Sequence, residues 1–120
     1  MNLSNYHSHC SFCDGRSMPE EFVKFALAKS FRAYGISSHG PLPFETFWNM
    51  SAFDMPEYLV EISRLKEKYQ GHLEVYTGME IDYLDTTYNP SIPYFQSLPL
   101  DYRIGSVHFL PIATELCEAN

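Results

Sequence analysis

The feature that most constrains the fold is an alternation of short apolar segments with two segments of helical periodicity. Apolar side chains recur every three or four residues over 55–69, which predicts an amphipathic helix that ends at Gly71. A second helix is expected over residues 18–32, behind a capping box at 17–20. Residues 54–57 form a similar capping box before the first-named helix.

Four short apolar segments are expected to be strands, at residues 2–9, 33–38, 73–80 and 101–107, with a short helix near 91–96. The order strand, helix, strand, helix, strand implies right-handed crossovers and a parallel sheet. Four parallel strands do not close a barrel. We therefore predict an α/β fold with an open sheet edge, through which the chain would be prone to self-association.

Chemically reactive side chains follow the expected strands at their carboxyl ends. They are His7 and His9 after the first strand, His39 after the second, Glu80 at the end of the third and His108 after the fourth. In parallel α/β folds functional groups gather at that edge of the sheet. The sequence thus predicts one cluster of imidazoles and a carboxylate.

The composition of this cluster is typical of a metal site. His7 and His9 are two residues apart, so on an extended strand their rings point to the same face. Glu80 has two oxygens with which to bridge two ions, and Asp14 could reach the site from the loop after the first strand. Mixed nitrogen and oxygen ligands favour Zn, Mn or Fe over Ca or Mg.

Other interpretations of these residues stay open. A single histidine at a strand end is more often a surface residue than a ligand, and only the joint pattern favours metal binding; His72 precedes a strand and is expected at the surface. Cys10 and Cys13 form a C-x-x-C pair that could bind zinc or undergo redox chemistry, but lacks a second pair and a helix at its start. We expect them to be ordinary packed thiols.

Two further features have both a structural and a functional interpretation. The aromatic side chains within residues 44–53 are expected to form the core of a loop, with a substrate platform as the alternative. Arg16 could hold a phosphate, because the guanidinium fork matches phosphate oxygens, or it could be a surface charge.

Charge and hydropathy exclude two classes of partner. The net charge is -7 and the eight basic residues are scattered, which argues against nucleic-acid binding. An acidic chain can still bind an anionic phosphate if metal ions supply the local positive charge. There is no apolar stretch of membrane-spanning length and no secretory signal, so we expect a cytoplasmic protein with reduced thiols.

Five motifs occur together in the order and at the spacing of one known family: Tyr6–His9, Asp14–Gly15, Ser38–Gly40, Gly78–Asp82 and Gly105–Phe109. They resemble the motifs of the polymerase-and-histidinol-phosphatase (PHP) family. Residues 38–44 and 101–108 are most similar to histidinol-phosphatases. The resemblance implies that residues 1–120 are the N-terminal part of a PHP domain, a distorted (β/α)7 TIM-like barrel with parallel strands.

The resemblance also implies a site with up to three divalent metal ions. In it, one ion would be bound by His7 and His9, with Glu80 bridging to a second ion that His108 binds, and Asp14 and His39 would serve the third. The implied substrate is a small phosphorylated metabolite, histidinol phosphate, hydrolysed to histidinol and phosphate in histidine biosynthesis. Glu80, His108 and Asp14 are the residues expected to take part in catalysis.

The family completes its site with a further His and with an Asp and a His near its C-terminus, and no counterparts follow His108 here. Residues 111–120 do not resemble the family's continuation, which suggests a truncated, frameshifted or incompletely predicted reading frame. We therefore expect the chain alone to be a weak or inactive phosphatase. The alternatives are a PHP enzyme for another phosphoester, a non-catalytic metal-binding or interaction fragment, and a structural domain with incidental histidines.

Overall fold

The computed structural model describes residues 3–112 and 115–118, with side chains described to residue 110. The elements in chain order are β1 (Leu3–Asn5), α1 (Pro19–Ala28), β2 (Phe31–Ile36), α2 (Met55–Lys68), β3 (Glu74–Asp82), α3 (Pro93–Gln96), β4 (Tyr102–Ser106), β5 (Phe109–Ile112) and β6 (Glu115–Glu118).

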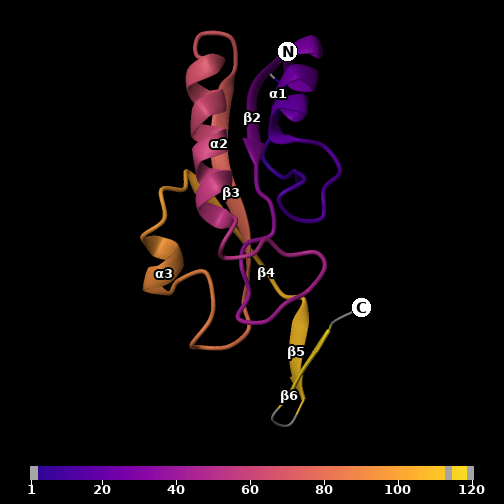
Figure 1. The fold of residues 1–120 in the computed structure, drawn as a ribbon, viewed down its shortest axis with the longest axis vertical. Helices are drawn as coiled ribbons and strands as arrows, with labels where there is room; N and C mark the ends of the chain where they lie inside the picture. The colour runs from indigo at the N-terminus through magenta and orange to yellow at the C-terminus, as the bar shows by residue number, and fades with distance from the viewer. Residues whose placement is uncertain (1–2, 113–114, 119–120) are drawn as a thin grey trace.

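The first four strands form one parallel sheet in the order β1-β2-β3-β4, and α1 and α2 pack on β2 and β3 (Figure 1). Each strand lies beside its neighbour in sequence, as is usual where the connections between strands are short. The sheet is curled into half of a barrel, which confirms the expected α/β fold class. All four strands therefore bring their carboxyl ends to the same edge.

The core lies between the helices and the sheet. The apolar face expected on α2 is buried there, with Tyr58, Ile62 and Leu65 fully buried against Ile36 and Met79. This packing explains why the three- and four-residue periodicity predicted α2 almost to the residue. The same face of α2 carries no charged residue, so burial costs no unpaired charge.

The structure corrects the expectations for α1. The helix ends at Ala28 rather than near residue 32, because Phe31 already belongs to β2 and Ser30 makes the turn between them with a positive φ of 60°. The cap is Met18, whose backbone N–H donates to Glu21 Oε1 at 3.1 Å, one residue later than expected. Phe25 of this helix is 54% exposed, so its ring lies outside the core.

Other boundaries also differ from the sequence-based expectations. The α2 cap, Asp54, makes no side-chain capping hydrogen bond, so residues 54–57 do not form a capping box. Strand β1 ends at Asn5, four residues earlier than expected, and β3 continues to Asp82, two residues beyond its expected end. The longer β3 carries an additional carboxylate into the site.

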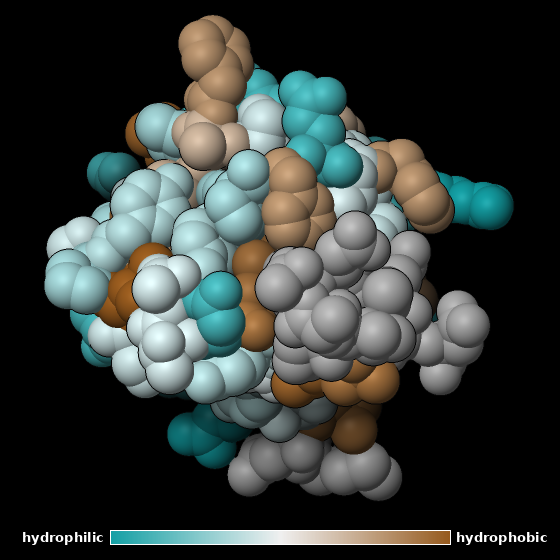
Figure 2. Space-filling view, turned by 90° about the horizontal axis from the view of Figure 1, so that it is seen from below, coloured by the Kyte–Doolittle hydropathy of each residue, from teal (hydrophilic) through white to brown (hydrophobic). Residues whose placement is uncertain are grey.

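After His108 the chain forms an antiparallel hairpin of β5 and β6, which the sequence did not predict. The hairpin projects from the α/β body and lengthens the molecule to 51 Å (Figure 1). Seen from that end, hydrophobic side chains stand out among hydrophilic ones (Figure 2). Within the described part of the chain, none of the helices has both the length and the apolar character needed to cross a bilayer.

Candidate metal centre

Backbone pairing beyond the end of β2 sets His39 beside Glu80. Glu80 N–H donates to Ser38 O at 3.0 Å, and Gly40 N–H donates to Glu80 O at 2.8 Å. These two bonds form an isolated parallel bridge between His39 and Glu80, three residues beyond the last pair of β2 and β3. The imidazole of His39 and the carboxylate of Glu80 therefore emerge next to each other at the carboxyl edge of the sheet.

The segment with the first two histidines is held by hydrogen bonds rather than by a regular strand. Ser37 N–H donates to Ser8 O at 2.8 Å, Ser8 Oγ donates to Gly35 O at 2.9 Å, and Cys10 N–H donates to Ser38 Oγ at 3.0 Å. This extended path turns alternate side chains to one side. The two rings of the His-x-His pair accordingly face the same neighbour, although β1 ends before them.

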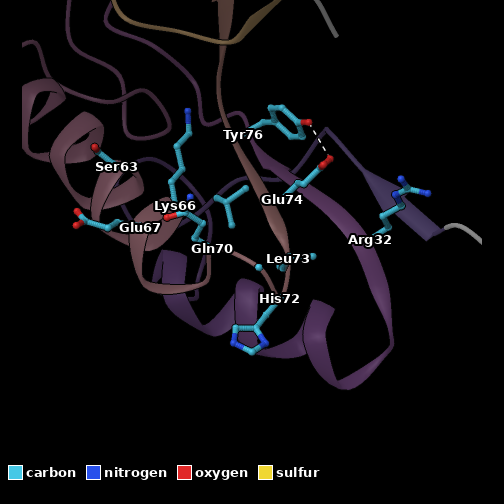
Figure 3. Close-up of a pocket in the computed structure, with 11 residues that line it drawn as sticks. Arg32, Ser63, Lys66, Glu67, Gln70, His72, Leu73, Glu74 and Tyr76 are labelled. Atoms are coloured by element: carbon cyan, nitrogen blue, oxygen red, sulfur yellow. Dashed lines mark hydrogen bonds between the residues drawn. The ribbon is translucent and has the colours of Figure 1, made fainter.

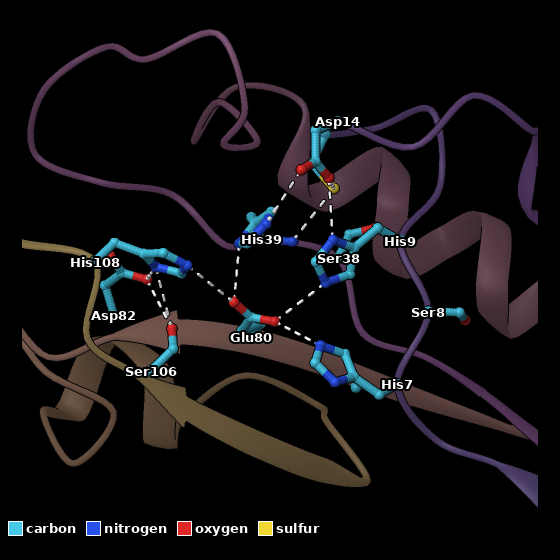
Figure 4. A network of polar contacts seen from close by, with 12 residues as sticks. His7, Ser8, His9, Asp14, Ser38, His39, Glu80, Asp82, Ser106 and His108 are labelled. Atoms are coloured by element: carbon cyan, nitrogen blue, oxygen red, sulfur yellow. Dashed lines mark hydrogen bonds and ion pairs between the residues drawn. The ribbon is translucent and has the colours of Figure 1, made fainter. Parts of the chain in front are cut away.

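Glu80 is at the centre of the site, and each of its oxygens faces a different pair of histidines (Figure 4). Oε1 lies 2.7 Å from His7 Nε2 and 3.1 Å from His9 Nε2. Oε2 lies 3.2 Å from His39 Nδ1 and 3.7 Å from His108 Nε2. A carboxylate between two sets of nitrogen donors is the arrangement required to bridge two cations.

Asp14 approaches from the loop after β1 and links two of these histidines. Its Oδ1 lies 3.0 Å from His9 Nδ1 and its Oδ2 lies 3.3 Å from His39 Nε2. The loop passes so close to its own beginning that a Cβ at Gly15 would lie 2.1 Å from His9 O. Glycine is needed at this position because any side chain would push the loop, and Asp14 with it, away from the histidines.

Asp82 is the residue of this site that sequence reasoning missed. It is buried, and its Oδ1 lies 2.7 Å from His108 Nδ1 while accepting a hydrogen bond from Ser106 Oγ at 2.9 Å. Glu80 and Asp82 are two residues apart on β3, so they share a face. That spacing was a usable signal, but the strand was expected to end at Glu80.

The ligand atoms gather in three overlapping groups, within each of which they lie no more than 4.8 Å apart. The groups are His7, His9 and Glu80; His9, Asp14 and His39; and His39, Glu80, Asp82 and His108. The structure therefore brings together all six residues that the sequence named as candidate ligands, and adds a seventh.

The donor set fits divalent cations. Two buried polar atoms of the cluster, His39 Nδ1 and Asp82 Oδ2, make no hydrogen bond of good geometry with any described residue, although His39 Nδ1 lies 3.2 Å from Glu80 Oε2. Leaving such atoms unpaired costs about 1–3 kcal/mol each. Imidazole nitrogens with carboxylate oxygens are ligands that suit Zn, Mn or Fe. A cation bound among these groups would give both unpaired atoms a partner.

The electrostatics of the cluster favour the protonation states that metal ligands need. Burial raises the pKa of the Glu80 carboxyl, but the hydrogen bond from His7 and the charges of His39 and His9 outweigh it, and the net pKa is lowered. The pKa of Asp14 is lowered in the same way, with burial opposed by the contacts of Cys13, His39 and His9. Burial lowers the pKa of His39 and so favours its neutral form.

The cysteines contact the cluster without belonging to any of the ligand groups found among the described residues. Cys10 is buried and lies 3.2 Å from Ser38 Oγ; Cys13 Sγ accepts from His39 N–H and donates to Asp14 Oδ1, both at 3.3 Å. Burial raises the pKa of both thiols, which disfavours the thiolate that zinc binding or redox chemistry requires. They match the expectation of packed thiols.

The other residues considered in the sequence lie partly in the core and partly at the surface. Within the aromatic loop, Trp48 is buried with its ring 4.8 Å from that of His39, whereas Phe47 and Phe53 are each 92% exposed, so only part of this segment forms a loop core. Arg16 is exposed, two residues after Asp14. His72 is exposed, as expected.

A hollow of about 830 Å³ lies at the opposite end of the sheet, around the start of β3 (Figure 3). Arg32, Lys66, His72 and Glu74 are among its lining residues, and Lys66 is paired with Asp101. Its lining reaches along β3 to Tyr76, which is four strand residues, about 13 Å, before Glu80. It therefore lies apart from the candidate metal centre.

Comparison with known proteins agrees with this geometry. The chain is 33% identical over 123 residues to the histidinol-phosphatase of Bacillus subtilis. It resembles the crystal structure of histidinol phosphate phosphatase from Lactococcus lactis, complexed with Zn, L-histidinol and phosphate, with a TM-score of 0.74 and 26% identity. The alignments cover 92% of this chain in both cases, but only 45% and 41% of those proteins, so the chain spans less than half of their length.

The family model for the PHP domain matches residues 5–118. The match includes all seven residues of the candidate centre. It also includes most of the segment after residue 110, which the sequence alone did not associate with the family, and that expectation is corrected. The chain belongs to the PHP domain family, and what its described residues form is the N-terminal part of such a domain's barrel.

Proposed function

We propose that this chain carries the N-terminal part of the active site of a metal-dependent phosphomonoester hydrolase that acts on histidinol phosphate. The observation that carries the proposal is the position of Glu80, whose two oxygens each face a separate pair of histidines. A lone ion site would need only one of these pairs. The Zn, L-histidinol and phosphate bound by the Lactococcus lactis protein support both the metal and the substrate class.

The proposed ligand roles follow the three groups. One ion is held by His7 and His9, and Glu80 bridges it to a second ion held by His108. Asp14 and His39 serve a third ion. Asp14 Oδ2 and His39 Nε2 lie 3.3 Å apart, so both atoms could bind the same ion.

Asp82 is proposed to orient His108. A carboxylate that accepts the Nδ1–H of an imidazole fixes its tautomer and leaves Nε2 free to bind a metal. The Asp82 Oδ1 contact to His108 Nδ1 is 2.7 Å, and Nε2 of the same ring points toward Glu80 (Figure 4).

Divalent ions bound here would supply charge to neutralise phosphoryl oxygens and lower the pKa of water to near neutrality. The chain's own hydrogen bonds and packing hold these carboxylates and imidazoles in place before substrate arrives. Arg16, exposed near Asp14, is proposed as a phosphate contact because its guanidinium can bind two oxygens at once.

We also propose that residues 1–120 form a partial PHP domain whose activity alone is weak. The ligands that the family adds later in the chain would complete the coordination of the same ions. The outer strands of the sheet, β1 and β4, each have one unpaired edge among the described strands. We expect these edges to favour self-association, which analytical ultracentrifugation over a range of concentrations would detect.

Two measurements on the purified chain test the proposal. Elemental analysis after purification without chelators measures bound Zn, Mn and Fe, and release of inorganic phosphate from histidinol phosphate measures turnover. We expect the wild type to contain bound metal and to hydrolyse histidinol phosphate slowly. The double variant His7→Ala/Glu80→Gln should lose the metal. His72→Ala is the matched control, because this histidine is exposed and outside the cluster. Absence of metal would refute the proposal.

A further inference from the structure

We propose that Tyr102 is a positioning residue that reaches across the inner face of the sheet and fixes the segment that carries His7 and His9. The inference rests on the proposed function, because it concerns two of the proposed metal ligands. Tyr102 is the first residue of β4, which is the edge strand of the sheet farthest from β1. Its role would be to hold ligands rather than to touch a metal or a substrate.

The contact that carries the proposal is a hydrogen bond between the two outer strands of the sheet. The Tyr102 hydroxyl donates to the carbonyl oxygen of Tyr6 at 2.5 Å, although β2 and β3 lie between the two strands. Tyr6 is the first residue after β1 and the one immediately before His7. The bond therefore acts on the backbone at the point where regular strand pairing has ended.

Two glycines clear the path of the tyrosine ring. A Cβ at Gly78 of β3 would lie 2.3 Å from Tyr102 Cζ, and a Cβ at Gly35 of β2 would lie 2.3 Å from the Tyr102 hydroxyl. Such distances are not tolerated, so any other residue at either position would displace the ring. The neighbouring strands thus leave a channel along which the ring lies from β4 to β1.

The bond from Tyr102 adds to the two contacts that His7 itself makes. Its N–H donates to Asn5 Oδ1 at 2.9 Å, and its ring lies 2.7 Å from Glu80 Oε1. Strand β1 is three residues long and its pairing with β2 ends at Asn5. The His7 side chain is 59% exposed, so packing does not fix its position. Metal affinity depends on how well ligands are held in place before the ion binds.

The surroundings of the hydroxyl favour a persistent bond. Burial raises the pKa of Tyr102 to about 12, so the phenol keeps its proton and remains a donor. The Tyr6 ring packs edge-on against that of Tyr102, with centroids 6.0 Å apart, and is tilted against that of Tyr76 at 5.8 Å. The three rings hold the Tyr6 backbone within reach of the hydroxyl.

The test compares two variants that each lose one hydroxyl from this aromatic cluster. Tyr102→Phe removes the bond to Tyr6 but keeps the ring that fills the channel. Tyr76→Phe is the matched control, because its hydroxyl donates to Glu74 Oε2 instead. Both variants keep their ring volume, and urea unfolding checks that both remain folded.

The first readout is the ¹⁵N NMR spectrum of the histidine rings in the metal-free chain. We expect Tyr102→Phe to shift or broaden the His7 and His9 signals while the His108 signals, held by Asp82, stay in place; Tyr76→Phe should leave all of them unchanged. The second is a Zn²⁺ titration, in which Tyr102→Phe should bind about 3- to 10-fold more weakly, the loss of about one hydrogen bond.

The outcomes separate the two proposals. His7 and His9 signals in Tyr102→Phe that coincide with those of the wild type would overturn the role of Tyr102, whatever the metal result. Equal changes at His7, His9 and His108 would also overturn it, because they would indicate general loosening. If the wild type binds no Zn²⁺, the proposed function fails, and the NMR comparison still decides the role of Tyr102.

Discussion

The hydroxyl of Tyr58 connects the core to the site, which makes Tyr58→Phe an informative perturbation. This fully buried side chain of α2 contacts backbone groups of both central strands. Its hydroxyl lies 2.7 Å from Gly78 O and 3.0 Å from Ile36 O, and accepts from Ser38 N–H at 3.2 Å. The last contact is made one residue before a proposed metal ligand.

The loss of stability expected for Tyr58→Phe follows from counting these hydrogen bonds. One hydroxyl has one proton, so it donates to one of the two carbonyls at a time, and removing it loses one donated bond worth about 1 kcal/mol. The N–H of Ser38, which is buried, also loses its hydrogen-bond partner, which costs about 1–3 kcal/mol. The phenylalanine ring fills the same space, so no cavity contributes. We expect a loss of about 2–4 kcal/mol in the free energy of unfolding.

Urea denaturation followed by circular dichroism measures this loss. With a slope of about 2 kcal/mol per molar urea, the midpoint should fall by about 1–2 M. Tyr94→Phe is the control: Tyr94 is 41% exposed and its hydroxyl makes only a weak contact to Met55 Sδ at 3.9 Å, so its midpoint should barely change. A Tyr58→Phe midpoint that matches the control would refute the reasoning.

Three further predictions concern single residues. Asp82→Asn should weaken Zn²⁺ binding about 10-fold in a titration, because His108 loses a charged orienting partner. Glu20 pairs with Lys68, which lowers the pKa of Glu20 from 4.5 to about 2. The difference in stability between the wild type and Glu20→Gln should therefore be largest above pH 4.5 and vanish as the pH falls toward 2. Urea midpoints of both proteins at several pH values measure this difference. Gly71→Ala should cost about 1 kcal/mol in the same assay, because Gly71 has a φ of +87°.

Residue patterns along the sequence predicted the helix α2 and the parallel arrangement of the strands. The periodicity of α2 matched its buried face because one helix packs on one sheet. The alternation of elements predicted a parallel sheet, and the carboxyl-edge rule then placed His7, His39 and Glu80 together, as the structure shows. Chain order and element type were enough for this.

Features that depend on tertiary contacts were not accessible in the same way. Glu80 and Asp82 both lie inside β3 because pairing with β4 extends to Asp82↔Ser106, and the apolar pattern of β3 alone did not reveal that extension. The end of α1 depends on where β2 pairs with its neighbours. The bond from Tyr102 to Tyr6 joins residues 96 apart, and no local pattern predicts such a contact.

The most direct test of the account is a calorimetric Zn²⁺ titration of the wild type, Glu80→Gln and the exposed control Glu57→Gln. A metal centre organised by Glu80 predicts tight binding of at least one ion by the wild type and by the control. It predicts a loss of affinity of about 10-fold or more in Glu80→Gln, because a neutral amide cannot bridge two cations. Equal affinity in Glu80→Gln and the wild type, or no binding by the wild type, would contradict the claim that Glu80 organises a metal centre.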